Sequence, residues 1–161
     1  FPIRLQPVEC DTLLLNSFET FEPMAKEKNI SFTVSLPRTA LPPCLSDGER
    51  LSQVIAILLH NAISYTPSGG SISLALSSNT AKKPEALTLS IADNGIGIPD
   101  EEKDKIFQRF YRSDRSRSVK NHFGLGLPIA SEIIRSLDGT IRVVDTPGGG
   151  STFLVRLPFR S

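Results

Sequence analysis

In the stretch LTLSIADNGIGIP, residues 87–99, a strand pattern ends in a carboxylate and a run of glycines. Every second residue from Leu87 to Ile91 is apolar, and alternate side chains of a strand point to the same face, so Asp93 continues the apolar face. A carboxylate on an apolar face is costly unless it is paired or hydrogen-bonded. Asp93 is therefore expected to require a hydrogen-bond donor.

The residues that follow leave two interpretations of Asp93 open. Asn94, Gly95 and Gly97 let the backbone turn sharply and let another group approach closely. In one interpretation, Asp93 caps its own turn, as aspartates often do. In the other, it accepts a hydrogen bond from a ligand, for example from the exocyclic amine of a base. These residues by themselves favour neither interpretation.

The composition excludes several classes of protein. The chain has 161 residues and a formal net charge of +1, which suits one domain with a sizeable core and gives no reason to expect a nucleic-acid partner. No apolar run approaches the length of a membrane span, so no direct membrane contact is expected. Cys10 and Cys44 are too few and too far apart for a disulfide framework, and a zinc centre is not indicated. They are expected to be ordinary reduced residues of a cytoplasmic protein.

Hydrophobic periodicity predicts the secondary structure. Helices are expected over residues 11–28 with Asp11 as N-cap, over 48–66 capped by Ser46 or Asp47, and from residues 124–126 to Gly139. Strands are expected at residues 30–36, 72–76, 87–93, 140–145 and 151–157, with residues 1–10 as an entry strand or linker. The strands before residue 94 each have one apolar and one polar face, which predicts helices on one side of the sheet only. The expected fold class is an α/β (α+β) two-layer sandwich forming a single domain, residues 1–161.

Three further features carry chemical information. Asn61 lies at the edge of an apolar helix stripe, where its amide needs partners. A bond to a nearby loop is the more ordinary interpretation, and a bound ligand is the other. Residues 100–123 are densely charged and form either a solvated loop or a lid over an anion. Residues 124–126, GLG, open a helix whose backbone N–H groups suit an anion.

These features together are suited to a nucleotide with its phosphates and a metal. Mg²⁺ prefers oxygen ligands and retains waters, so one asparagine oxygen plus phosphate oxygens is a reasonable shell. The chain has no P-loop, because no GK[ST] follows glycines at the required spacing. The segment GLGLPI also lacks the third glycine of a dinucleotide fold.

The chain resembles the catalytic ATP-binding domain of bacterial sensor histidine kinases, in the GHKL ATPase superfamily. The family's blocks occur in order: DGERLSQVIAILLHNAISYTP (asparagine box), DNGIGIP (first glycine box), IFQRFYRSD (phenylalanine box), FGLGLPIA (second glycine box) and GGGSTFLVRLP (closing strand). The resemblance covers essentially the whole chain. It implies a Bergerat-type mixed β-sheet with three main helices on one face and a long ATP lid at about residues 100–123.

The resemblance also implies that the chain binds ATP and Mg²⁺. Asp93 would accept a hydrogen bond from the adenine amino group, Asn61 would ligate Mg²⁺, and Arg112 would be the catalytic residue that reaches the γ-phosphate. The other implied nucleotide-binding residues are Tyr65, Gly95, Gly97, Ile98, Phe107, Phe110, Gly124, Leu125, Gly126 and Ser151. Among these, Phe107 and Phe110 would anchor the lid, and a small hydroxyl residue at the place of Ser151 would lie near the base.

The phosphoacceptor is not found in the sequence. His60 lies in the nucleotide helix and His122 at the end of the lid, so neither is a credible acceptor. The chain begins at Phe1 rather than at Met, and we expect the dimerisation and phosphoacceptor domain upstream of it, with this chain at the cytoplasmic end of a membrane-bound sensor. A response regulator would act through that domain. The present chain is expected to be monomeric and cytoplasmic.

Some positions depart from the family pattern. Ile57 stands where hydrolytic relatives carry the glutamate that activates water, and isoleucine cannot act as a base. Ser64 replaces a common lysine, and His122 and Phe123 replace a glycine and a serine or threonine. These departures motivate one alternative function, a degenerate nucleotide-binding or interaction module without phosphotransfer. A GHKL-type ATPase is the other, and Ile57 argues against it.

Overall fold

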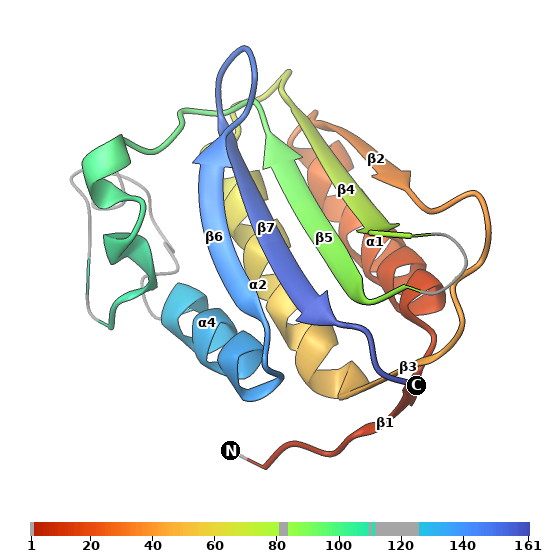
Figure 1. Cartoon of the computed structure of the whole chain (residues 1–161). Coiled ribbons are helices and arrows are strands. Elements are labelled where there is room, and N and C mark those ends of the chain that lie inside the picture. The colour runs from red at the N-terminus through yellow and green to blue at the C-terminus, as the bar shows by residue number, and fades with distance from the viewer. Residues whose placement is uncertain (1, 81–83, 110, 112–125) are drawn as a thin grey trace.

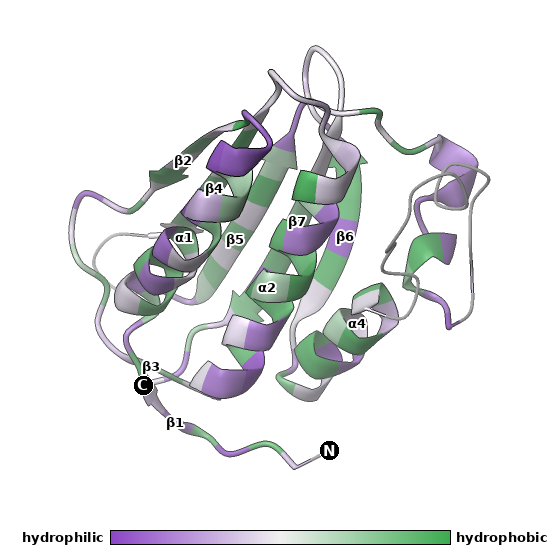
Figure 2. Cartoon of the chain, turned by 180° about the vertical axis from the view of Figure 1, so that it is seen from behind, coloured by the Kyte–Doolittle hydropathy of each residue, from purple (hydrophilic) through white to green (hydrophobic). Residues whose placement is uncertain are grey.

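The computed structural model describes residues 2–80, 84–109, 111 and 126–161, and in these ranges the chain forms two layers (Figure 1). One layer is a five-stranded sheet. The other contains the helices α1 (Cys10–Glu27), α2 (Gly48–Tyr65) and α4 (Gly126–Ser136). Figure 2, which shows the molecule from behind, places all of these helices over the same face of the sheet. The predicted two-layer sandwich with helices on one face is confirmed.

The sheet is mixed, with strand order β2-β4-β5-β7-β6. Its strands are β2 (Ser31–Ser35), β4 (Ser71–Ser78), β5 (Ala86–Asp93), β6 (Thr140–Asp145) and β7 (Ser151–Pro158). Strands β2 and β4 are parallel, and the other neighbouring pairs are antiparallel. Strand β5 therefore lies in the centre, and Asp93 at its end pairs with Ile72 of β4 and lies next to the start of β7.

The core lies between the sheet and the helices. The inward residues of the strands are buried as the alternation predicts: Ile72, Leu74, Leu76, Leu87, Leu89, Ile91, Phe153, Val155 and Leu157. Helix α2 covers the middle of the sheet with Val54, Ile55, Leu58, Leu59 and Ala62, none of which is more than 1% exposed. Helix α2 is thus the buried support from which Asn61 and Tyr65 project.

The predicted helix starts are half right. Asp47 is the N-cap of α2, and its carboxylate accepts a hydrogen bond from the Arg50 N–H at 3.1 Å. Asp11, however, is not the cap of α1, because that helix begins at Cys10 and Glu9 occupies the cap position. The Asp11 carboxylate lies in the first turn, where a negative charge is favourable, and accepts a hydrogen bond from the Leu41 N–H at 3.2 Å.

The sequence pattern missed one strand and misplaced one helix end. Strands β1 (Gln6–Val8) and β3 (Cys44–Ser46) form a separate two-stranded sheet. The sequence predicts only an entry strand or linker in residues 1–10 and no strand at β3, because three residues are too short for a periodic signal. Helix α4 ends in a left-handed residue as expected, but this residue is Asp138, with φ of 61°. Gly139 is required for another reason, since a Cβ there would lie 2.5 Å from the Arg156 carbonyl oxygen.

Cys44 of β3 and Cys10, the first residue of α1, interact although they are far apart in sequence. Both are buried free thiols. The hydrogen bond with Cys44, together with burial, raises the pKa of the Cys10 thiol above its ordinary value. Within the described ranges, none of the helices has both the length and the apolarity needed to cross a bilayer.

Candidate functional site

Four of the predicted site residues, Tyr65, Asp93, Gly95 and Ser151, lie where the end of β5, the end of α2 and the start of β7 come together. Asp93 is 4% exposed, and the N–H groups of Gly95 and Ser151 both donate to its Oδ1, at 2.9 and 3.1 Å. The bond from Gly95, two residues along the chain, is the expected turn cap. Among the described residues no donor is found for Oδ2, so this oxygen is left to accept a hydrogen bond from a ligand.

The environment of Asp93 is costly for a charge. Burial raises the pKa of this carboxyl above its ordinary value of 3.8, and the two N–H donors offset only part of that effect. Carboxyl groups whose pKa is raised by burial are typical of functional sites.

Glycines let three segments approach one another at the site. A Cβ at Gly95 would lie 2.2 Å from the Tyr65 carbonyl oxygen, so the glycine turn lies directly on the end of α2. A Cβ at Gly150, which has φ of 105°, would lie 2.1 Å from the Asp93 carbonyl oxygen. Gly97 also has a positive φ, of 75°, which favours glycine there.

The importance of Gly150 escaped the sequence interpretation, which treated it as a turn residue only. The run of glycines before Ser151 was the available signal. Its contact with the Asp93 carbonyl joins residues that are far apart in the chain, which local patterns do not reveal.

Asn61 lies on α2 with only 6% of its surface exposed. Among the described residues, none donates to or accepts from its side-chain amide, so the loop partner of the more ordinary interpretation is not found there. Buried amides normally have partners, and one for which the described residues supply none suits a ligand. The side-chain oxygen of Asn61 is the kind of hard donor that Mg²⁺ accepts.

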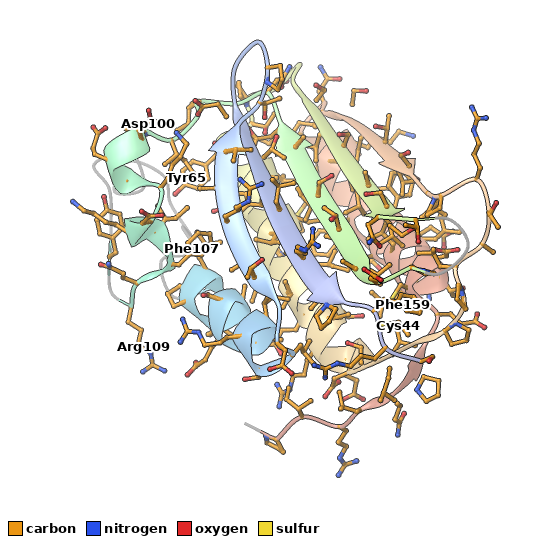
Figure 3. The ribbon with its side chains drawn as sticks, in the orientation of Figure 1. Cys44, Tyr65, Asp100, Phe107, Arg109 and Phe159 are labelled. Atoms are coloured by element: carbon orange, nitrogen blue, oxygen red, sulfur yellow. The ribbon has the colours of Figure 1, made fainter. Side chains whose placement is uncertain are left out.

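Tyr65 lies one helical turn after Asn61 and is half-buried. Its backbone carbonyl accepts a hydrogen bond from the Ile96 N–H at 3.4 Å, which ties the end of α2 to the glycine turn. In Figure 3, Tyr65 and Phe107, the last residue of η2 (Lys105–Phe107), are both seen toward the β6 edge of the sheet.

The described part of the predicted lid begins with two 3₁₀ helices, η1 (Asp100–Glu102) and η2 (Lys105–Phe107). Phe107 is half-buried and packs edge-on against Phe153, with ring centroids 6.1 Å apart. Ile98 also packs against the core. Of the other predicted site residues, Phe110, Arg112, Gly124 and Leu125 lie outside the described residues, and Gly126 is the first residue of α4.

Comparison with known proteins decides the family. A family profile described as "Histidine kinase-, DNA gyrase B-, and HSP90-like ATPase" matches residues 46–161. The chain belongs to this family. The histidine kinase-like ATPase fold expected from the sequence is therefore confirmed, with its mixed sheet backed by helices.

Individual relatives of this histidine kinase-like ATPase domain are sensor kinases. The chain is 34% identical over 157 residues to the sensor histidine kinase WalK of Bacillus subtilis (strain 168), which covers 97% of this chain and 24% of WalK. The chain thus spans about a quarter of that relative's length.

Two solved structures show the same likeness in three dimensions. The catalytic domain of the histidine kinase ThkA superposes with a TM-score of 0.82 at 25% identity, covering 98% of this chain and 97% of that one. Full-length ShkA in complex with AMPPNP superposes with a TM-score of 0.85 at 29% identity, covering 100% of this chain and 32% of that one.

Proposed function

We propose that the chain is the ATP-binding catalytic domain of a sensor histidine kinase, which donates the γ-phosphate of ATP to a histidine on a separate dimerisation domain. The observation that carries this proposal is Asp93. Its carboxylate is buried at the end of the central strand, Oδ1 is held by two backbone N–H groups, and Oδ2 is left to accept. An adenine amino group is a donor of the required kind.

The other side chains take roles around that contact. Gly95 and Gly97 would shape the adenine pocket, and Ser151 would lie near the base because its own N–H fixes Asp93. Tyr65, Ile98 and Phe107 would line the nucleotide. Phe110, Gly124, Leu125 and Gly126 would contact it from the lid and the start of α4, as the motifs imply.

Mg²⁺ fits the residues that are present. Asn61 offers a buried amide oxygen, and magnesium characteristically takes its remaining ligands from phosphate and water. When bound, the ion would offset phosphate charge during phosphoryl transfer, which depends on positioning and electrostatics. Arg112 would supply the chain's own positive charge at the γ-phosphate. The acceptor histidine, the dimerisation domain and a response regulator would belong to other parts of a cytoplasmic signalling assembly, in which the present chain is monomeric.

The test is a calorimetric titration of ATP into the domain, with and without Mg²⁺. A hydrogen bond to a charged group contributes about 1.5–3 kcal/mol, so Asp93→Asn is expected to weaken binding by about 10- to 150-fold. Asp138→Asn is the matched control, because this aspartate is exposed in the α4–β6 loop and asparagine tolerates its left-handed conformation. Absence of ATP binding by the folded wild type would overturn the proposal.

A second assay separates the rival functions. With a matching acceptor domain and ATP, the kinase is expected to yield phosphohistidine. Binding without phosphohistidine would favour the degenerate module. Steady phosphate release by the domain alone would favour an ATPase, although Ile57 offers no base to activate water.

A further inference from the structure

The Lys103 side chain joins its own segment, residues 98–103, to the distant end of β6. It is only 16% exposed, and its Nζ donates to the Ile98 carbonyl oxygen at 3.0 Å and to Asp145 Oδ1 at 2.9 Å. It also donates to the carboxylate of Asp100 at the start of η1 (labelled in Figure 3). A single ammonium group thus uses its donors on three different acceptors.

Two of these acceptors are directly connected to the candidate site. Ile98 belongs to the glycine turn, one residue after Gly97. Asp145 is the last residue of β6 and pairs in register with Ser151 of β7, whose N–H holds Asp93. Lys103 therefore links the glycine turn, which forms one side of the candidate site, to β6, the strand beside β7.

The arrangement fixes the path of the chain as it leaves the glycine turn. Pro99 has φ of −60°, which its ring enforces. The carbonyl just before it, that of Ile98, is held by Lys103, and Lys103 is held in turn by Asp145. The hydrogen bonds with Asp100 and Asp145 raise the pKa of the lysine, so it remains a cation throughout the physiological pH range.

We infer that Lys103 is a positioning residue for nucleotide binding, which holds the glycine turn and the start of η1 against β6 without contacting the nucleotide. The inference rests on the proposed function of the site. A nucleotide that binds to a glycine turn already held in place loses no free energy in ordering it, so the contacts of Lys103 strengthen binding. Once the nucleotide is bound, the glycine turn is in place with or without Lys103, so the rate of phosphoryl transfer does not depend on this residue.

The test measures ATP binding by Lys103→Met, which keeps the length of the side chain and removes its donors. We expect ATP to bind about three- to tenfold more weakly, because the tie combines an exposed ion pair with a shielded hydrogen bond. Lys105→Met is the matched control. It removes the same charge from the exposed surface of η2 and is expected to leave affinity within about twofold of wild type.

Two more variants separate positioning from general stability. Lys103→Arg retains the charge and several donors, and should recover most of the affinity. Asp145→Asn should weaken binding by about two- to threefold alone and add little in the Lys103→Met background, since both remove the same tie. With an acceptor domain supplied, Lys103→Met should raise the KM for ATP and leave kcat unchanged.

The outcomes are distinct. If the folded wild type does not bind ATP, the proposed function fails, and the inference fails with it. If the wild type binds ATP and Lys103→Met binds equally well, only the inference is overturned. Equal losses in Lys103→Met and Lys105→Met would also overturn it, because they would reflect simple attraction of a negative ligand. Additive effects of Lys103→Met and Asp145→Asn would show that the two side chains act separately.

Discussion

The two sides of the candidate site are held in place by different forces. On one side, the ends of α2 and β5 and the start of β7 touch through backbone atoms at Gly95 and Gly150, above a buried core. On the other side, the segment from Asp100 to Phe107 is held by Ile106 and Phe107, which pack against the core, by the hydrogen bond from Tyr111 to Glu102 and by the polar bonds of Lys103. Changes on the first side should therefore affect both folding and binding, and changes on the second side mainly binding.

The largest effect is expected from Gly150→Ala. The new Cβ would overlap the Asp93 carbonyl, and φ of 105° would strain an alanine, so we expect a loss of roughly 3 kcal/mol or more in the free energy of unfolding. Gly148→Ala is the matched control, because its φ is 89° but nothing lies within 4 Å of the added Cβ. It should cost only about 1 kcal/mol. If urea unfolding shows that the two variants lose the same free energy of unfolding, this would contradict the close contact between Gly150 and the Asp93 carbonyl.

The aromatic pair tests both sides, because each side supplies one phenylalanine that can be replaced by leucine. Phe153→Leu, in a side chain with no exposure, should lower the free energy of unfolding by about 1–2 kcal/mol. Phe107→Leu, on the half-buried partner, should cost about half as much or less. If Phe107 anchors the lid, its variant should nevertheless weaken ATP binding. A Phe107→Leu variant that is as unstable as Phe153→Leu would remove the contrast between the two sides.

Asp93→Asn is expected to stabilise the domain while it impairs binding. Since burial raises the pKa of Asp93 in the folded state, its ionisation favours the unfolded state, and an amide avoids that cost while keeping an oxygen for Gly95 and Ser151. At pH 7 we therefore expect the variant to have a higher free energy of unfolding than the wild type.

The stability of this variant relative to the wild type depends on pH. Below the ordinary pKa of 3.8, Asp93 is protonated in both the folded and the unfolded state. At such pH values its ionisation does not lower the free energy of unfolding, and the stability associated with the protonated carboxyl is fully present. It is lost as the pH rises through the raised folded-state pKa. The advantage of the asparagine variant in urea unfolding should accordingly grow from about pH 4 to pH 7. An advantage that is absent at pH 7 would mean that the carboxylate is well solvated.

The smallest effect is expected on the outer side. Arg109 and Glu132 form an ion pair with 3.9 Å between Nη2 and Oε2, and both side chains are more than half exposed. Arg109→Gln should change the free energy of unfolding by less than about 0.5 kcal/mol, with little dependence on salt. A larger, salt-sensitive loss would show that electrostatic ties on this side contribute to folding.

Much of the fold and part of the site could be predicted from local sequence. The alternation in residues 87–93 predicts a strand whose apolar face is buried, and the same face reveals Asp93 as a carboxylate in need of donors. The capping of α2 by Asp47 depends on contacts within one helical turn, and it was also predicted correctly. The blocks of the histidine kinase-like ATPase family, which the chain matches over residues 46–161, extended these local inferences to a fold.

Only the tertiary structure decided which distant segments meet. The donors to Asp93 include Ser151, which is 58 residues away, and periodicity gives the face of a residue but not its partner. The parallel pairing of β2 with β4, the contact of Gly150 with Asp93 and the bond between Asp11 and the Leu41 N–H have the same origin. So does the tie from Lys103 to Asp145, because a lysine in a charged stretch gives no sign of its acceptors. Local sequence sets what each segment requires, and packing of the whole chain determines which neighbour supplies it.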